Sequence, residues 1–449
     1  MKGTHRGRED ASFGGRALSR RDFLKGLAAV GVAAGGGFLM PRRDAFASVD
    51  VRRLDPVERL AYEKLKSFTD WIKRERVRGY LGEVGWPSDA RHGVKDGRKW
   101  NALADKWYGW ADDANLWVTA HDINERQIYG GYYMSIYTAV GERGRRALSV
   151  AKPQATVLEA HPANANYKRG INDETGSSIE RHDFHNKNLG EFGKSGPNNY
   201  WYAGVANDGP DGGNSFEYLR ERNIRVVRMG FRWERFMPGG PGTNLSEVEL
   251  QRYRAAVDAA GRAGLEVILD AHNYGGYWFE ENGKAVERLI NGDRVSIENF
   301  VDLWKQLSDR FKNDPAVIGY DLMNEPDVAQ GRFASEDLAW QAATRMAVAA
   351  IRANGDGKTI IAPTYFGKGD PDEKLPKAWI DDPAEDILYT AHQYFDTARG
   401  GDTGGGRYSN TYANEAAHLR DRYPDSKPVA KDKRKRAARA RRRQRRRNR

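Results

Sequence analysis

The second half of the sequence alternates short apolar segments with longer amphipathic ones, and this pattern restricts the fold more than any other feature. Apolar runs typical of buried strands occupy residues 224–230, 265–270, 317–323, 359–363 and 387–391. Segments with apolar side chains at helical spacing lie between them, at residues 246–263, 297–311 and 336–353. Strands that alternate with helices in this way form a parallel sheet.

The first half adds three shorter strand-like runs, at residues 78–83, 115–120 and 170–172. Helical patterns accompany them at residues 54–76, 99–114 and 151–160. The total of about eight strands predicts an α/β fold of the closed (β/α)8 barrel type, also called a TIM barrel, and 449 residues are enough for one such barrel with insertions. Residues 164–216, rich in Asn, Gly and Asp, are expected to form a long irregular connection.

The N-terminus carries an export signal. Paired arginines at Arg20 and Arg21 precede a short, Gly-rich apolar run, and Ala45-Phe46-Ala47 resembles a cleavage site. The string around the two arginines resembles a bacterial twin-arginine signal. We therefore expect residues 1–47 to be a signal peptide and the mature protein to be secreted.

The net positive charge of the chain comes from its C-terminus. The net charge is +11, and residues 431–449 contain thirteen Lys or Arg and one Asp, or +12, which leaves −1 for the rest. This tail is expected to be disordered. It can contact anionic cell surfaces through charge but gives no reason to expect specific nucleic-acid binding. The predicted domain is therefore residues 48–430, and the absence of cysteine excludes disulfides, zinc thiolate sites and cysteine nucleophiles.

Polar and titratable residues follow the predicted strands at one end. In a parallel barrel the catalytic groups lie at the C-terminal ends of the strands. Residues at or just after these ends are Glu83, Arg228, His272, Asn273, Asn324, Glu325, His392 and Tyr394. Two carboxylates in such a set suit glycoside hydrolysis, which needs one protonated acid and one ionised nucleophile or base.

Four motifs in order, each after an apolar strand, carry a resemblance to a known family. They are Arg228 with Trp233-Glu234-Arg235, Asp270-Ala-His272-Asn273-Tyr274, Asn324-Glu325-Pro326, and His392-Gln-Tyr394. Over roughly residues 169–396 they resemble glycoside hydrolase family five, the cellulase family. The resemblance implies that Glu325 is the acid/base of a retaining reaction. It also implies that Arg228, His272, Asn273, Asn324, His392 and Tyr394 line the sugar-binding subsite at the cleavage point.

The nucleophile departs from the family pattern, in which a glutamate follows the His-x-Tyr strand. Nothing after Tyr394 fits this role, whereas residues 68–89 and 100–120 resemble the family's last two strands with their helices. The chain thus resembles a circularly permuted barrel with strands seven and eight at the N-terminus and Glu83 as nucleophile. Glu191, in a second Gly-Glu motif, is the alternative nucleophile.

The last strand of the family pattern also differs. His121 stands where family members usually carry a tryptophan, and the resemblance places it among the substrate-binding residues. Trp117 is expected to point into the barrel core. Asp270 is expected to be a structural hydrogen-bonding residue at a strand end.

The resulting hypothesis is an endo-acting β-glycanase that hydrolyses β-1,4-glucan-type polysaccharides with two glutamates. It requires neither cofactor nor metal, and the expected partner is the polysaccharide substrate of a monomeric enzyme. The alternatives within the family are a β-mannanase and another β-glucanase. The alternative from another class is a degenerate barrel that binds carbohydrate or cell wall without cleaving it.

Overall fold

The chain divides into two units, residues 1–37 and 38–449, and every described residue belongs to the second unit. The computed structural model describes residues 46, 48–87, 96–124, 134–139, 147–177, 192, 200–205, 215–282, 284–326, 337–364, 377–396 and 411–428. The predicted signal peptide, except for residue 46, the alternative nucleophile Glu191 and the basic tail at residues 431–449 lie outside this set.

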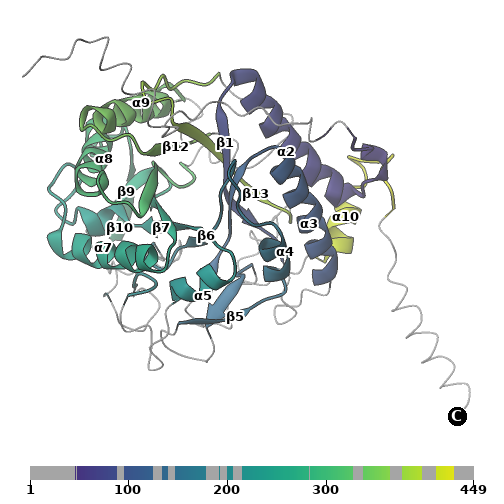
Figure 1. Ribbon diagram of the computed structural model, residues 1–449. Coiled ribbons are helices and arrows are strands. Elements are labelled where there is room, and N and C mark those ends of the chain that lie inside the picture. Colours follow the sequence, from purple (N-terminus) through teal and green to yellow (C-terminus); the bar gives the residue numbers. More distant parts are fainter. Residues whose placement is uncertain are drawn as a thin grey trace, which may run out of the picture. The chain divides into compact units, whose positions relative to one another are not determined.

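Eight parallel strands close into a barrel (Figure 1). In chain order they are β1 (Arg78–Gly85), β2 (Trp117–Ala120), β6 (Arg169–Asp173), β7 (Val226–Phe231), β8 (Glu266–Ala271), β11 (Val317–Asp321), β12 (Thr359–Pro363) and β13 (Ile387–Tyr394). Each strand pairs with the next one in this series, and β1 closes the ring against β13, from Arg78 beside Leu388 to Gly85 beside Tyr394. The predicted (β/α)8 barrel is confirmed.

Helices surround this barrel on the outside (Figure 1). They are α2 (Pro56–Glu75), α3 (Gly97–Asp113), α4 (Ala155–Ala160), α5 (Ser215–Glu221), α6 (Trp233–Phe236), α7 (Glu247–Arg262), α8 (Ile297–Phe311), α9 (Asp337–Ala353) and α10 (Tyr412–His418), together with a 3-10 turn η1 (Val51–Arg53). No helix in the described part of the chain is both long and apolar enough to cross a membrane.

The ends of helix α2 show why these segments are helical. Asp55 accepts hydrogen bonds from the backbone of Val57 and Glu58, and the Glu58 side chain accepts one from the Asp55 backbone. This capping box satisfies N–H groups that the first helical turn leaves unpaired. Pro56 occupies the first helical position, where its missing N–H costs nothing. Arg76 ends the helix in the left-handed conformation.

The core has two layers. A small cluster fills the inside of the barrel, and it contains Tyr80, Trp117, Tyr167, Val226, Ile268, Ile361 and Leu388. A much larger cluster lies between the strands and the surrounding helices. Trp117 belongs to the inner cluster and is only 8% exposed, which confirms the expectation that it is a core residue.

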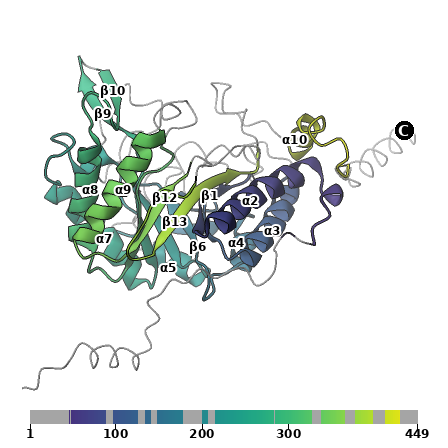
Figure 2. The ribbon, with the colours of Figure 1, turned by 90° about the horizontal axis from the view of Figure 1, so that it is seen from above.

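Two small sheets lie outside the barrel and were not expected from the sequence. The antiparallel hairpin of β9 (Gly276–Glu281) and β10 (Lys284–Leu289) follows β8 and projects beyond the barrel (Figure 2). The other sheet consists of β3 (Ile123–Asn124), β4 (Tyr137–Ala139) and β5 (Leu148–Ala151). The helix predicted at residues 151–160 is therefore wrong at its start. Ala151 belongs to strand β5, and the helix, α4, begins only at Ala155. Residues before a proline favour extended backbone, so the chain stays extended up to Pro153.

Candidate active site

The C-terminal ends of the barrel strands bring together most of the predicted site residues. Glu83 lies in β1, Arg228 in β7, and His392 and Tyr394 in β13. His121 and His272 directly follow β2 and β8, while Asn324 and Glu325 lie three and four residues after the end of β11. The hydrogen bonds and ion pairs described below join all of these except His121 into one network, and His121 lies beside it.

Arg228 is the centre of this network. Its guanidinium has five N–H groups, and each donates a hydrogen bond of 2.8 to 3.2 Å. The acceptors are Glu83, Asn172, Asp270, Asp321 and Asn324. Burial lowers the pKa of Arg228, but the surrounding carboxylates raise it well above its ordinary value, so the side chain stays charged. One cation therefore orients groups from four other strands.

Glu83 is held as an ionised carboxylate. Its Oε1 accepts a hydrogen bond of 3.2 Å from Arg228, and its Oε2 accepts a short one from the Tyr394 hydroxyl. Burial raises the pKa of Glu83, but His392, His121 and Arg228 together lower it well below its usual range. An anion that is 4% exposed and fixed by two donors has the properties of a positioned nucleophile.

Glu325 differs from Glu83 in its surroundings. Its side chain is 39% exposed, and its Oε1 lies 2.9 Å from His392 Nδ1. The same nitrogen lies 3.4 Å from Oε2 of Glu83. One oxygen of each glutamate and a His392 ring nitrogen all lie within 4.8 Å of one another. The two carboxyl groups therefore face the same small space, one enclosed and one open to solvent.

His272 is fixed on both sides of its ring. Nδ1 lies 2.7 Å from Asp270 Oδ2, and Nε2 lies 3.1 Å from the hydroxyl of Tyr274. Asn324 Nδ2 also lies 3.1 Å from Nε2, while its Oδ1 accepts from Arg228. The expected structural role of Asp270 at a strand end agrees with these contacts, because Asp270 holds both His272 and Arg228.

Asn273 does not join this group. Its Oδ1 accepts a hydrogen bond from the Trp233 backbone, and its Nδ2 donates to Glu234 and to the Gly276 carbonyl. The residue has no exposed surface. Its side chain thus holds the loop after β8, and the expectation that it contacts sugar is corrected.

His121 follows β2 and is buried beside the network. Its Nδ1 lies 2.9 Å from Glu174 Oε1, and its ring packs edge-on against the ring of Tyr394. Burial lowers the pKa of His121, but Glu174, Asp122 and Glu83 raise it to about 10. His121 is therefore a cation beside Glu83, and its contact with sugar stays a prediction.

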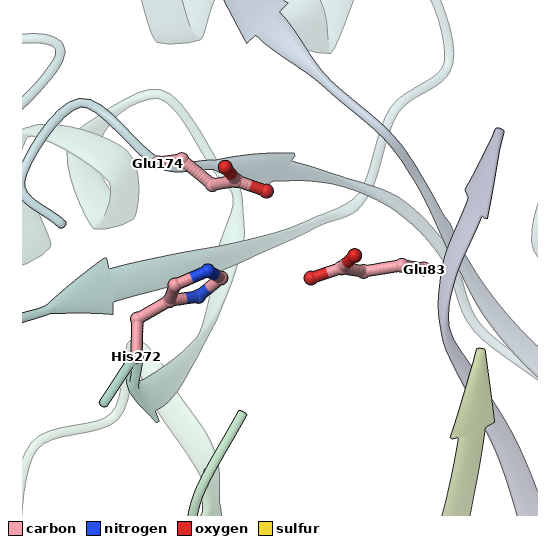
Figure 3. Close-up of side chains that lie close together, drawn as sticks. All are labelled: Glu83, Glu174 and His272. Atoms are coloured by element: carbon pink, nitrogen blue, oxygen red, sulfur yellow. The ribbon is translucent and has the colours of Figure 1, made fainter. Parts of the chain in front are cut away.

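Sequence reasoning missed Glu174, which directly follows β6. Figure 3 shows its carboxylate converging with Glu83 and the ring of His272. One ligand atom of each of these residues lies within 4.8 Å of the others. The sequence signal was present, because Glu174 closely follows the strand-like run predicted at residues 170–172, as the other site residues follow their strands. This run is short, and it lies within the polar stretch at residues 164–216 that was predicted to be irregular.

Three clusters in the described part of the chain have the composition of a metal site. They are Glu83, Glu325 and His392; Glu83, Glu174 and His272; and His121, Asp122 and Glu174. Each carboxylate pair in them is already balanced by Arg228 or by a histidine cation close by. These contacts account for the carboxylate charges of the three clusters, and the expectation that the reaction needs no metal ion stays a prediction.

Comparison with known proteins agrees with this geometry. Residues 184–436 match the model of the cellulase family, glycosyl hydrolase family 5. The chain belongs to glycosyl hydrolase family 5. The family match includes Arg228, His272, Asn324, Glu325, His392 and Tyr394, whereas Glu83 and His121 lie before it.

Several curated proteins are similar to part of the chain. The probable endo-beta-1,4-glucanase B of Neosartorya fischeri is 28% identical over 39% of this chain and 49% of its own length. Endoglucanase 1 of Robillarda is 27% identical over 40% of this chain and 48% of its own length. The chain thus spans about half the length of these curated relatives.

A solved structure and a signal model also match. The endoglucanase Cel5A of Pseudomonas stutzeri is 26% identical, with a TM-score of 0.41 over 57% of this chain and 73% of its own. Residues 17–37 match the twin-arginine translocation signal. The predicted export by this pathway is thereby confirmed.

Proposed function

We propose that this family 5 member is a retaining, endo-acting β-1,4-glucanase with Glu83 as nucleophile and Glu325 as acid/base. The observation that carries the proposal is the distance between the two carboxyl groups, whose nearest oxygens lie within 4.8 Å. Retaining glycosidases place their two carboxyl groups about 5–5.5 Å apart, whereas inverting ones need about 6.5–9.5 Å to admit a water. The separation therefore favours a covalent glycosyl-enzyme.

The reaction proceeds in two displacements. Glu83 attacks the anomeric carbon, and Glu325 gives its proton to the departing glycosidic oxygen, so one C–O bond forms as the other breaks. Glu325, now a carboxylate, removes a proton from water. This water attacks the same carbon, releases Glu83 and restores both carboxyl groups to their starting states. The exposure of Glu325 gives the water and the leaving group access to it.

Neighbouring side chains prepare the two glutamates for these roles. Arg228 and Tyr394 hold Glu83 in one orientation and keep it ionised before substrate arrives. His392 contacts both glutamates and keeps their relative placement fixed. Such preorganisation lowers the barrier because little reorientation is needed at the moment of reaction.

The order of the strands supports a second part of the proposal, that the barrel is circularly permuted relative to the family. Strands β1, β2 and β6 precede the family match at residues 184–436, and β1 with Glu83 pairs with β13, which carries His392 and Tyr394. In the family pattern the strand of the nucleophile comes after the His-x-Tyr strand, which here is β13, so β1 has the expected neighbour. A closed barrel tolerates permutation because its first and last strands lie side by side.

The substrate proposal rests on the names of the relatives, which are endo-β-1,4-glucanases. β-Mannan and other β-glucans are the competing substrates, and a polysaccharide bound by a monomeric enzyme is the proposed partner. The site contains both carboxylates and their supporting residues, and this favours a catalyst over a barrel that only binds sugar.

Hydrolysis of soluble β-glucans by the mature protein tests the proposal. We expect Glu83→Gln and Glu325→Gln to lose at least about 1,000-fold in kcat, and the wild type to release the β-anomer first, as followed by NMR. Glu191→Gln serves as the matched comparison and is expected to keep activity. Collapse in Glu191→Gln with an active Glu83→Gln would move the nucleophile, and inactivity of the wild type on all glycans would favour the binding barrel.

A further inference from the structure

Glu174 is a third carboxylate in the site, and the two-glutamate reaction does not use it. A local turn holds it in place. The side chain of the preceding residue, Asp173, accepts hydrogen bonds from the backbone and hydroxyl of Thr175, and Ser177 donates to the Glu174 carbonyl. Gly176 leaves no room for a Cβ, which would lie 2.1 Å from the ring of Tyr202. The position of Glu174 is therefore set by the packing of the turn.

The carboxylate of Glu174 remains available to a ligand. Its Oε1 is enclosed against His121, yet the side chain as a whole is 26% exposed. The exposed part therefore belongs to its other atoms. An ionised carboxylate has about four acceptor sites, and one contact with His121 leaves the others usable. The pKa of Glu174, which burial raises, is lowered overall by His121, so the group is an anion.

The neighbours of Glu174 have less capacity to accept. Both oxygens of Glu83 already accept hydrogen bonds, and both ring nitrogens of His272 have close polar neighbours. These residues and Glu174 nevertheless face one common space (Figure 3). A polar group that enters this space and has a proton to donate finds Glu174 as its strongest remaining acceptor.

The reaction geometry identifies the sugar atom involved. Glu83 bonds to the anomeric carbon, so the hydroxyl nearest to it is the one on the adjacent carbon, the 2-hydroxyl. The next hydroxyl along the ring edge is the 3-hydroxyl. Because an oxygen of Glu174 lies within 4.8 Å of one of Glu83, two hydroxyls on neighbouring carbons can contact the two carboxylates at once.

We propose that Glu174, held by His121, accepts a hydrogen bond from the 3-hydroxyl of the sugar whose bond is cleaved. This inference rests on the proposed function and narrows its substrate class. The sugar in this subsite must carry a free 3-hydroxyl, as in a β-1,4-linked chain. A β-1,3-linked chain has that oxygen in its own linkage and cannot donate the bond.

The test compares 4-nitrophenyl β-cellobioside with an analogue that lacks the 3-hydroxyl on the glucose next to the aryl group. Loss of a charge-assisted hydrogen bond corresponds to about 10- to 100-fold in kcat/KM. We expect Glu174→Gln to show this loss on the parent and less than about 3-fold on the analogue. The exposed Glu221→Gln is the matched control and should leave both substrates unaffected.

Equal losses on both substrates, or no loss on either, would overturn the inference. The first result would assign Glu174 a structural or electrostatic role. If Glu174→Gln unfolds, Glu174→Asp keeps the charge but withdraws it by one methylene and serves in its place. If the wild type cleaves nothing, the proposed function fails. Calorimetric binding of cellotriose and of its 3-deoxy analogues then still tests Glu174.

Discussion

Glu83 in β1 and Arg228 in β7 are joined by a hydrogen bond of 3.2 Å, although β2 and β6 separate their strands in the barrel. The bond crosses the mouth of the barrel rather than following the sheet. It ties the proposed nucleophile to the same guanidinium that holds Asn324, the neighbour of the proposed acid.

Arg228→Lys tests this shared support. A lysine ammonium has three donors and cannot reproduce the planar fork, so several buried carboxylate and amide oxygens would lose their partner. We expect kcat to fall at least about 100-fold and stability to fall by about 3 kcal/mol. Arg225→Lys is the control, because Arg225 lies just before β7 and its side chain donates to the backbone carbonyls of Arg220 and Ile224. Near-normal kcat in Arg228→Lys would show that charge alone suffices.

Tyr394→Phe removes the hydroxyl that donates to Glu83. The depressed pKa of Glu83 should rise, because one donor that stabilises the anion is lost. In the proposed reaction, activity requires ionised Glu83 and fails as pH falls through the pKa of this group, so the acid limb of kcat/KM should move to higher pH. We also expect roughly a 10-fold lower kcat. Tyr423→Phe, far from the barrel mouth, should leave the profile in place, and an unmoved acid limb in Tyr394→Phe would contradict the assignment.

His121 links the site to the pH dependence of stability. Its pKa is raised to about 10 in the folded protein, against about 6.5 when unfolded. The stabilisation is complete below about pH 6.5 and is lost as pH rises toward 10. Between pH 6 and 10 the Tm of the wild type should therefore fall by roughly 2–4 °C more than that of His121→Gln. His418→Gln, an exposed site, should follow the wild type, and parallel curves for all three proteins would refute the charge of His121.

Trp117→Ala tests the inner layer of the core. The side chain fills the barrel beside Tyr80 and Leu388, and its loss leaves a cavity that rigid strands cannot close. We expect a loss of about 3–5 kcal/mol in unfolding free energy, measured with urea. Val248→Ala, at an exposed position, should change stability little. A small effect of Trp117→Ala would mean that the barrel interior repacks.

The basic tail provides a test of the partner proposals. Removing residues 431–449 takes away about twelve positive charges. We expect hydrolysis of neutral β-glucan to be unchanged, because the site residues all lie in the barrel. Retention on an anionic resin at low salt should decrease. A loss of glucan hydrolysis on deletion would give the tail a role in catalysis.

The position of most site residues could be predicted because one rule governs them. Residues that follow parallel strands at their C-terminal ends meet at one face, and this located Arg228, His272, Asn324 and His392 without a structure. Glu174 obeys the same rule. It was missed because the strand-like run at residues 170–172 is short and lies within a polar stretch whose composition predicts an irregular connection.

Side-chain direction could not be predicted in the same way. Asn273 follows β8 as His272 does, yet its amide bonds to Trp233, Glu234 and Gly276 within the loop. Whether His272 or Asn273 faces the site depends on the turn that follows β8, in which Tyr274 has the left-handed conformation. The hairpin β9–β10 escaped prediction for a related reason, because its strands contain charged residues in place of a continuous apolar run.

The closing pair of the barrel, β1 with β13, joins the first and the last strand in the described part of the chain. Glu83 comes from one and Tyr394 from the other, so neither half of the chain holds the complete site of the proposed nucleophile. The proposed hydrolysis therefore requires that β1 and β13 have already paired. Enzymatic activity is therefore a readout of ring closure, and during refolding it should appear together with the final strand pairing rather than with the earlier formation of helices.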